Sequence, residues 1–237
     1  CCVAAAQRGG RSGRAAPPQP NRLRAQLSVA SWNLLAPLYA PPNRYPWANP
    51  RDLEWRHRRE RILATLADID ADAVCLQEIE VDLWPDFCHR LHQLGYDAEL
   101  QQTGHHPVAC AILYRRGVLR CLRTESRSRA LIAVLARADA AVSDSHDSYL
   151  YLASVHLEAG AEKAAQRFHQ MRSLLRRIQL QRANDVAVAL GRPRALAPST
   201  DAAGAPIVLA GDFNFDRRSQ LYGLLSTGRA GKEGSMD

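Results

Sequence analysis

The chain has 237 residues, of which 46% are hydrophobic and 23% are charged, and its formal net charge is +7. This composition is typical of a globular protein with one substantial core, and no apolar run reaches the roughly 18–20 residues that span a bilayer. Residues 1–26 hold five arginines and no acid, which leaves 26 basic and 24 acidic residues elsewhere. The sequence pI of 9.4 is therefore weak evidence for nucleic-acid binding.

Residues 1–26 are rich in Arg, Ala, Gly and Pro without apolar periodicity, which predicts a disordered tail. The same composition is compatible with part of an organelle transit peptide. The chain has no Cys-x-x-Cys pair, which argues against a zinc site. Cys75 and Cys110 lie in apolar runs, and we expect them to be buried free thiols. Buried free thiols favour a reducing, intracellular compartment such as the cytoplasm.

Beyond the tail, the hydrophobic pattern predicts a mixture of strands and helices. Short apolar runs predict strands at 27–31, 73–76, 108–114, 118–122, 131–136, 149–155 and 207–210. Apolar residues at helical spacing predict helices at 53–67, 84–94 and 162–182 and a helix that starts at 219. Pro, Gly and polar residues predict loops at 37–50, 138–148 and 191–206. Strands and helices do not alternate strictly, so we expect a mixed-sheet α/β sandwich rather than a doubly wound parallel sheet.

Two local features complete this pattern. The strands at 108–114 and 118–122 flank Arg115-Arg116-Gly117, which predicts a hairpin. The charged residues of the first helix, from Arg56 to Glu60, are expected to form a solvated face.

The strand at 207–210 is followed by Gly211-Asp212-Phe213-Asn214. We expect Gly211 to allow a sharp turn. Asp212 and Asn214 would point to the same side of an extended segment, because they are two residues apart. A carboxylate and an amide at the end of a core strand cost desolvation free energy, which a hard cation or a phosphate would offset. The alternative is a polar turn in which Asn214 caps the next helix.

Three more polar residues, Asn33, Glu78 and His156, also lie just past apolar strands. If those strands run in one direction, the residues converge at one edge, where active sites are commonly built. Individually they could be a turn residue, a carboxylate near a helix N-terminus and a core histidine, respectively. Oxygen ligands without thiolates suit Mg²⁺ or Mn²⁺. Asp212 is the candidate general base, and Asn214 would position a phosphate oxygen.

The stretches around these residues resemble successive motifs of the endonuclease/exonuclease/phosphatase superfamily: Ser31-Trp32-Asn33-Leu34-Leu35, Leu76-Gln77-Glu78, Ser154-Val155-His156-Leu157 and Gly211-Asp212-Phe213-Asn214. Further stretches most resemble the carbon-catabolite-repressor-type deadenylase, nocturnin and Angel group: Tyr45-Pro46-Trp47, Ala111-Ile112-Leu113-Tyr114, Arg167-Phe168-His169-Gln170 and Ser219-Gln220-Leu221-Tyr222. The resemblance covers about residues 27–228. It implies a four-layer α/β sandwich of two packed mixed β-sheets flanked by helices.

The resemblance also implies an activity and a set of roles. It implies that Glu78 ligates Mg²⁺ with Asn33 beside it, that Asp212 and Asn214 are catalytic, and that His156 contacts the scissile phosphate or the terminal nucleotide. The implied enzyme is a Mg²⁺-dependent 3′–5′ exoribonuclease that acts on poly(A) or similar RNA tails in mRNA decay. One alternative is a phosphatase or phosphodiesterase for a nucleotide or an RNA-end phosphate. Another is a non-catalytic module that binds RNA or a partner.

The sequence departs from the deadenylase pattern in two places. Deadenylases follow the strand-end His with a His/Trp/Asp/Pro segment that helps hold the nucleotide, whereas this chain has Glu158-Ala159-Gly160-Ala161, so adenine preference stays open. Deadenylases end with a further Asp and an Asp-His motif, and Ser143-Asp144-Ser145-His146 does not match its position. We therefore expect residues 27–237 to form an incomplete domain with a partly open core. We also expect negligible phosphodiesterase activity from residues 1–237 alone.

Support for nucleic-acid binding outside these motifs is modest. Arg115, Arg116, Arg217 and Arg218 could contact a phosphate backbone. Tyr45 and Trp47 could stack on bases, whereas we expect Trp32 to pack in the core.

Overall fold

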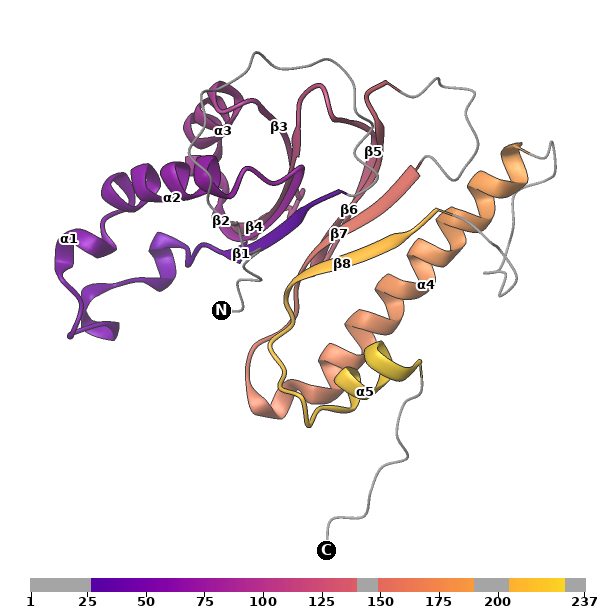
Figure 1. Cartoon of the computed structure of the whole chain (residues 1–237). Coiled ribbons are helices and arrows are strands. Elements are labelled where there is room, and N and C mark those ends of the chain that lie inside the picture. The colour runs from indigo at the N-terminus through magenta and orange to yellow at the C-terminus, as the bar shows by residue number, and fades with distance from the viewer. Residues whose placement is uncertain (1–26, 140–148, 190–204, 229–237) are drawn as a thin grey trace, which may run out of the picture.

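The computed structural model describes residues 27–139, 149–189 and 205–228. These residues form two four-stranded β-sheets that pack face to face, with helices on both outer faces (Figure 1). The four-layer α/β sandwich expected from the sequence is confirmed. The predicted tail at 1–26 and the segment Ser143–His146 lie outside the described residues.

The first sheet has the strand order β1-β2-β4-β3. β1 and β2 run parallel, and β4 runs antiparallel to both β2 and β3. The outer face of this sheet packs against α2 and α3. The bounds are β1 Val29–Asn33, β2 Ala73–Glu80, β3 Tyr96–Leu100, β4 Val108–Arg115, α1 Pro50–Leu53, α2 Trp55–Ile69 and α3 Trp84–Gln93. Short 3-10 turns occupy Pro37–Tyr39, Pro42–Arg44 and Val81–Leu83.

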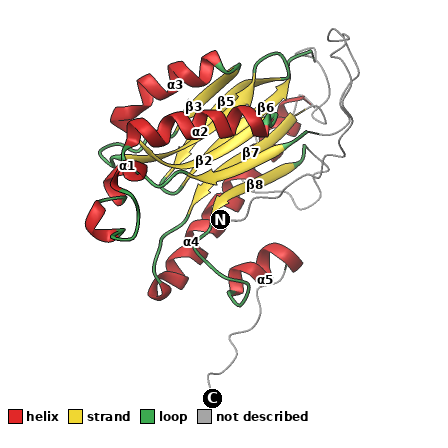
Figure 2. Cartoon of the chain, turned by 60° about the vertical axis from the view of Figure 1, so that its left-hand side comes forward, coloured by secondary structure: helices red, strands yellow, loops and turns green. Residues whose placement is uncertain are grey.

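The second sheet has the order β5-β6-β7-β8, with β5, β6 and β7 antiparallel and β7 parallel to β8. Its outer face packs against α4 and α5. In Figure 2, α2 crosses in front of the strands, whereas α4 lies behind them. The bounds are β5 Leu119–Arg127, β6 Ala130–Arg137, β7 Tyr149–His156, β8 Ile207–Asp212, α4 Ala164–Ala189 and α5 Gln220–Thr227, with a 3-10 turn at Ala161–Lys163.

The core is divided into layers by the two sheets. Along β6, Leu131, Ala133 and Leu135 pack between the sheets, whereas the alternate residues face α4. Strands buried on both faces read as continuous apolar runs, which is why the pattern along these segments does not alternate. Cys75 and Cys110 lie in the layer between the sheets as buried free thiols, as expected. Burial raises the pKa of the Cys110 thiol to about 12, so both cysteines act as small apolar side chains.

The hairpin predicted for 108–122 is wrong, because β4 and β5 belong to different sheets. β4 is already paired along both edges, by β2 and β3, so no edge of it is free for β5. The chain crosses to the second sheet at Arg116-Gly117, and β5 pairs instead with β6 across Ser128-Arg129. β5 also extends further than expected, to Arg127.

Other element bounds differ locally from the expectations. β3 has no counterpart among the predicted strands. The predicted helix at 53–67 is interrupted at Glu54, where φ and ψ are extended. α4 starts and ends later than the predicted helix at 162–182. The proline-rich loop at 37–50 contains two short 3-10 turns.

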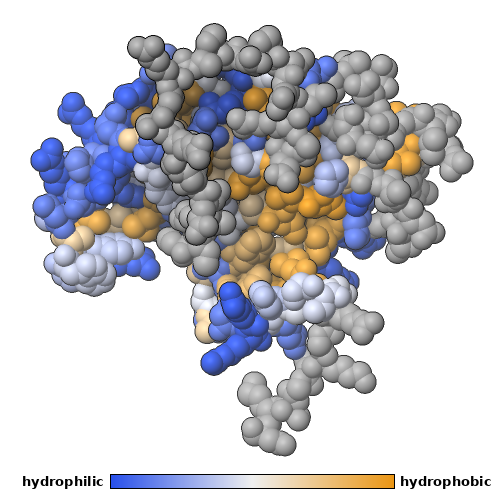
Figure 3. Space-filling model, in the orientation of Figure 1, coloured by the Kyte–Doolittle hydropathy of each residue, from blue (hydrophilic) through white to orange (hydrophobic). Residues whose placement is uncertain are grey.

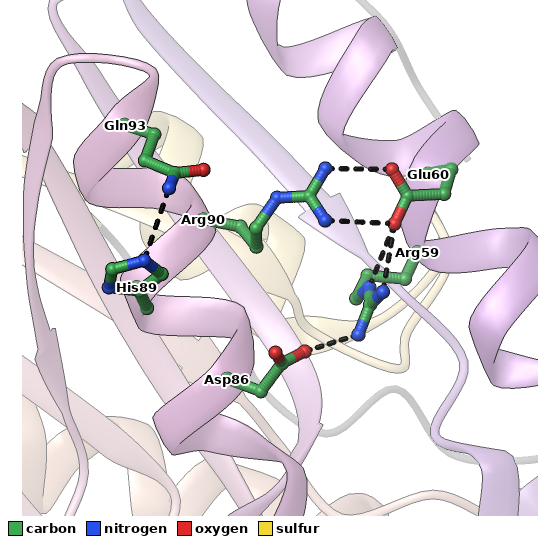
Figure 4. A network of polar contacts seen from close by, with 6 residues as sticks. All are labelled: Arg59, Glu60, Asp86, His89, Arg90 and Gln93. Atoms are coloured by element: carbon green, nitrogen blue, oxygen red, sulfur yellow. Dashed lines mark hydrogen bonds and ion pairs between the residues drawn. The ribbon is translucent and has the colours of Figure 1, made fainter.

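The charged run of α2 is not simply a solvated face. Figure 4 shows Glu60 of α2 between two arginines, with Arg90 Nη2 of α3 at 2.8 Å from its Oε2 and Arg59 Nη2 at 2.9 Å from its Oε1. Arg59 also contacts Asp86 of α3. Hydrogen bonds from Arg59 and Arg90 lower the pKa of the Glu60 carboxyl. Because Glu60 and Asp86 are exposed, these ion pairs link α2 to α3 but add little to the stability of the fold.

β8 forms one edge of the second sheet within the described residues, and each of its six residues is half-buried. Figure 3 shows apolar side chains gathered around β8 and α4 on this face of the molecule.

No helix of the described segments is both long enough and apolar enough to cross a membrane. The expectation of an incomplete domain with a partly open core stays a prediction.

Candidate active site

Four polar residues meet where the carboxyl ends of β1 and β2 in one sheet approach those of β7 and β8 in the other. Asn33 ends β1, His156 ends β7 and Asp212 ends β8, while Glu78 lies near the end of β2. Asn33 Nδ2 donates to Glu78 Oε1 and to Asp212 Oδ2, at 2.9 Å in each case. The structure brings the four predicted residues together, with two corrections. The four strands belong to two sheets and not to one sheet edge, and the residues are part of their strands and do not follow them.

Glu78 reaches this edge because β2 is bulged. The register with β4 shifts between Leu76 and Ile79, and Glu78 has a left-handed φ of 60°. Leu76 and Ile79 both pack toward α2 and α3, so one extra residue is inserted between them. At the bulge, the Glu78 side chain does not follow the in-and-out alternation of a regular strand. The Oε2 atom of Glu78 accepts a hydrogen bond from Ala36 N at 3.0 Å.

The turn after β1 is held by the Asn33 side chain and by Arg58 of α2. Asn33 Oδ1 accepts a hydrogen bond from Leu35 N at 2.9 Å, and Leu35 has a left-handed φ of 56°. Arg58 Nη2 donates to the carbonyl oxygens of residues 34 and 35. Arg58 was expected on a solvated face, and its actual position makes α2 part of the support of the site. Nothing in the sequence separates it from its arginine neighbours.

Asp212 is oriented by two partners. Its Oδ2 accepts from Asn33, and its Oδ1 accepts from Asn214 N at 3.1 Å. Gly211 lies within β8 and does not form the expected turn. Asn214 has a left-handed φ of 51°, so the expected extended segment is wrong. The Asn214 amide instead donates to Leu157 O at 2.9 Å.

Asn214 therefore lies beside Asp212 but faces a different space from Glu78 and His156. It lines a cavity of about 890 Å³ between the start of α4 and α5, together with Phe168, Phe215 and Ser219. From this position, Asn214 fixes the Asp212 carboxylate and the segment that follows β7.

Glu78 and His156 line a separate pocket of about 430 Å³ at the edge where the four strands converge. The remaining lining residues are Leu35, Tyr39, Arg44, Tyr45, His106, Arg129, Leu157, Glu158 and Ala159. A neighbouring pocket of about 380 Å³ shares Tyr39, His106, Arg129 and His156 with it, so the two form one continuous cleft.

Burial and the neighbouring charges both act on the pKa of His156, and burial has the larger effect. Its Nε2 lies 3.7 Å from Glu78 Oε1. Burial lowers the pKa of His156 below its usual value and Arg129 adds to this, while Glu78 and Asp212 oppose it. The imidazole is therefore mostly neutral at pH 7 and can donate one hydrogen bond. Arg129 forms an ion pair with Glu158, so the segment that departs from the deadenylase pattern reaches this pocket.

The donor set at the site is two carboxylates with one amide between them. Within residues 27–139, 149–189 and 205–228, no arginine or lysine pairs with Glu78 or Asp212, and no three His, Cys, Asp or Glu side chains form a metal-binding group. Two uncompensated carboxylates on one amide nitrogen suit a divalent cation. One or two carboxylates, with water and substrate phosphate, are the usual holders of Mg²⁺. The residues present therefore fit Mg²⁺.

Residues 30–232 match the family model described as the Endonuclease/Exonuclease/phosphatase family. The chain is 28% identical over 225 residues to Protein angel homolog 2 of Danio rerio, which covers 88% of this chain and 36% of that protein. It is 40% identical over 62 residues to the CCR4-Not complex 3′-5′-exoribonuclease subunit Ccr4 of Neurospora crassa, covering 26% of this chain and 8% of that protein. The chain thus spans little more than a third of the angel homologue's length.

Two solved structures share the fold. The crystal structure of ANGEL2, described as a 2′,3′-cyclic phosphatase, superposes with a TM-score of 0.67 at 24% identity, covering 85% of this chain and 57% of that one. The human Nocturnin catalytic domain superposes with a TM-score of 0.61 at 19% identity, covering 86% and 69%. The resemblance stated from the motifs is confirmed, and the chain belongs to the endonuclease/exonuclease/phosphatase family.

Proposed function

We propose that this chain carries the catalytic centre of a Mg²⁺-dependent phosphodiesterase, a 3′–5′ exoribonuclease that acts on poly(A) or similar RNA tails. The observation that carries the proposal is the meeting of Glu78 and Asp212 on the Asn33 amide beside His156. The family match and the relatives named as exoribonuclease and phosphatase support phosphoester chemistry.

Glu78 and Asn33 form the cation site in this proposal. Glu78 would hold Mg²⁺, and Asn33, whose Oδ1 is engaged by Leu35 N, keeps the two carboxylates at a fixed separation. When bound, Mg²⁺ polarises the phosphoryl oxygen and screens the charge that develops on it. The bulge in β2 and the Arg58-supported turn are the devices that pre-organise this position.

Asp212 is the proposed general base. Its carboxylate would take a proton from the attacking water, which is worth on the order of 10²–10⁴-fold in rate. The water oxygen would form a bond to phosphorus, the bond from phosphorus to the leaving ribose oxygen would break, and that oxygen would take up a proton from solvent and leave as a hydroxyl group. Asn214 holds the Asp212 carboxylate through its backbone N–H. The expected contact between its side chain and a phosphate oxygen stays a prediction, because Asn214 lines the cavity between α4 and α5 and not the pocket of Glu78 and His156.

His156 is proposed to contact the phosphate. Burial keeps its imidazole mostly neutral, so it would donate one hydrogen bond to a phosphoryl oxygen without adding a full charge. His156 lines both of the neighbouring pockets of about 380 and 430 Å³, so it is also placed to contact the terminal nucleotide.

A second candidate is a phosphatase or phosphodiesterase that acts on an RNA-end or nucleotide phosphate. The ion pair between Arg129 and Glu158 favours it, because Glu158 places a carboxylate in the pocket where deadenylases have a nucleotide-holding segment. A relative with the same fold is described as a 2′,3′-cyclic phosphatase.

Hydrolysis of three substrates by the naturally expressed protein with Mg²⁺ would separate these candidates. The substrates are oligo(A), a mixed-sequence RNA of equal length and an RNA that ends in a 2′,3′-cyclic phosphate. We expect oligo(A) to be shortened from its 3′ end with release of mononucleotides. Removal of the cyclic phosphate alone would favour the second candidate, and no turnover of any substrate would favour a non-catalytic binding module.

A further inference from the structure

The segment that follows the second 3-10 turn forms one wall of the candidate active-site pocket. Arg44 and Tyr45 line the same 430 Å³ pocket as Glu78 and His156. Trp47 lies next to Tyr45, with ring centroids 5.8 Å apart and an interplanar angle of 69°. Trp47 is 79% exposed, the largest value among the exposed large hydrophobic side chains of the described residues. We call residues 44–47 the aromatic wall.

The aromatic wall is rigid. Prolines occupy positions 41, 42, 46 and 50 and fix the backbone φ at each of them. Successive turn hydrogen bonds join Arg44 N to Pro41 O at 2.9 Å, Tyr45 N to Pro42 O at 3.1 Å and Ala48 N to Tyr45 O at 3.0 Å. A ligand that binds here would lose little free energy in ordering the loop.

Arg44 is the arginine of this pocket whose side chain has no partner among the described residues. It is exposed, and within the described residues its guanidinium forms no ion pair or hydrogen bond. The other arginine that lines the pocket, Arg129, is paired with Glu158. Arg58, which supports the turn after β1, is engaged with backbone carbonyls. Arg44 is therefore the guanidinium available to a phosphate group without first breaking a contact.

An exposed tryptophan with a tyrosine at its edge and a free arginine beside it has the three groups that hold a single-stranded nucleic acid. Aromatic faces stack on bases irrespective of sequence, and arginine contacts the backbone phosphate. Arg44 and Tyr45 line the pocket of Glu78 and His156, whereas Trp47 does not line it and contacts Tyr45. A strand that left the pocket along this wall would therefore meet Arg44 and Tyr45 before Trp47.

We propose that the aromatic wall binds the RNA strand on the side away from the cleaved end. Arg44 contacts a backbone phosphate, Tyr45 stacks on the base nearest the scissile bond, and Trp47 stacks on the next base. This proposal rests on the proposed function and adds to it which residues hold the strand beyond the scissile bond. Because stacking is tolerant of sequence, the wall selects for length and single-strandedness and not for adenine.

The test compares an octanucleotide with a dinucleotide of the same base as substrates for the naturally expressed protein. Trp47→Ala is expected to lower kcat/KM for the octanucleotide about tenfold, as the loss of one stacked base predicts, and to leave kcat/KM for the dinucleotide unchanged. Tyr222→Ala, which removes an exposed aromatic ring of α5 that does not line the cleft, is the matched control. Trp47→Phe should retain most of the octanucleotide activity.

Two further arms separate stacking from charge. With an octanucleotide that lacks its bases except at the cleaved end, the effect of Trp47→Ala should disappear. Arg44→Ala should reduce the slope of log affinity against log salt by about 0.7, the value for one phosphate contact to a single strand. Thermal unfolding of each variant checks that the fold is intact.

The outcomes are distinguishable from failure of the proposed function. If Trp47→Ala lowers kcat/KM equally for the octanucleotide and the dinucleotide, or for neither, the proposal that the aromatic wall binds the strand is overturned. The proposed function is not affected by that result. An equal loss from Tyr222→Ala also overturns the proposal for the aromatic wall. A wild-type protein that neither binds nor cleaves the octanucleotide overturns the proposed function and the wall together.

Discussion

Asp212→Asn is expected to lower kcat for phosphoester hydrolysis by on the order of 10²–10⁴-fold, the range of a general base. Asparagine is isosteric, and its single side-chain oxygen can accept one of the two hydrogen bonds that the Asp212 oxygens accept from Asn33 Nδ2 and Asn214 N. It cannot take a proton from water. The measurement is steady-state hydrolysis of whichever RNA substrate the naturally expressed protein cleaves, at saturating Mg²⁺.

The thermal stability of Asp212→Asn should change little, because removal of the repulsion between the Glu78 and Asp212 carboxylates offsets the loss of one hydrogen bond to this side chain. Asp68→Asn, at an exposed position on α2, is the matched control. An activity loss no greater than that of Asp68→Asn would contradict the role of Asp212.

Gly211→Ala is expected to destabilise the fold by roughly 3 kcal/mol or more, because two costs combine at this residue. Gly211 pairs with Val155 in the parallel β7·β8 ladder and has a φ of 154°, a conformation that L side chains rarely adopt. A Cβ at this position would lie 1.9 Å from the Val155 backbone oxygen. A backbone atom cannot move aside by changing a rotamer, so β7 and β8 would have to separate.

Gly117→Ala is the matched control for this prediction. Gly117 also has a positive φ, of 81°, but an added Cβ there would meet nothing within 4 Å. It should cost only about 1 kcal/mol, from backbone strain. Urea unfolding followed by circular dichroism gives both values. Equal destabilisation by the two substitutions would show that the close approach of β7 and β8 is not what requires glycine.

The site could be found from the sequence because its residues end strands. A polar residue after a buried apolar run is visible without any structure, and Asn33, His156 and Asp212 all have that signature. The sequence does not show which of the four strands belongs to which sheet. β1 and β2 lie in one sheet and β7 and β8 in the other, so the site forms across the interface between the sheets and not along one sheet edge.

The expectations that are wrong concern backbone geometry set by tertiary contacts. An arginine pair before a glycine is a reasonable hairpin signal, and it fails at 115–117 because both edges of β4 are taken by strands distant in sequence. Asn214 leaves the extended conformation, and its amide is held by Leu157 O, which only the packed β7·β8 ladder brings near. β3 could have been predicted, since Tyr96, Ala98 and Leu100 alternate with acidic residues.

The bulge at Glu78 and the position of Arg58 could not be predicted from the sequence, because both depend on segments that are distant along the chain. The bulge is defined by the register of β2 against β4, which a local pattern cannot fix. Arg58 differs from the arginines around it only in facing a turn that is 23 or more residues away in sequence. The bulge and Arg58 support the site, whereas the Glu78 carboxylate that the bulge positions is the proposed Mg²⁺ ligand.

The central claim is that Glu78 holds a divalent cation beside Asp212, so that carboxylates from two different sheets form one metal-dependent centre. Calorimetric titration of the naturally expressed protein with Mg²⁺ or Mn²⁺, compared with Glu78→Gln and Asp212→Asn, tests this without any substrate. Glu54→Gln, at an exposed position, is the control. The account predicts that each site variant loses on the order of tenfold or more in affinity, as expected when a charged ligand or its carboxylate neighbour is removed. Unchanged metal affinity in both site variants would contradict it.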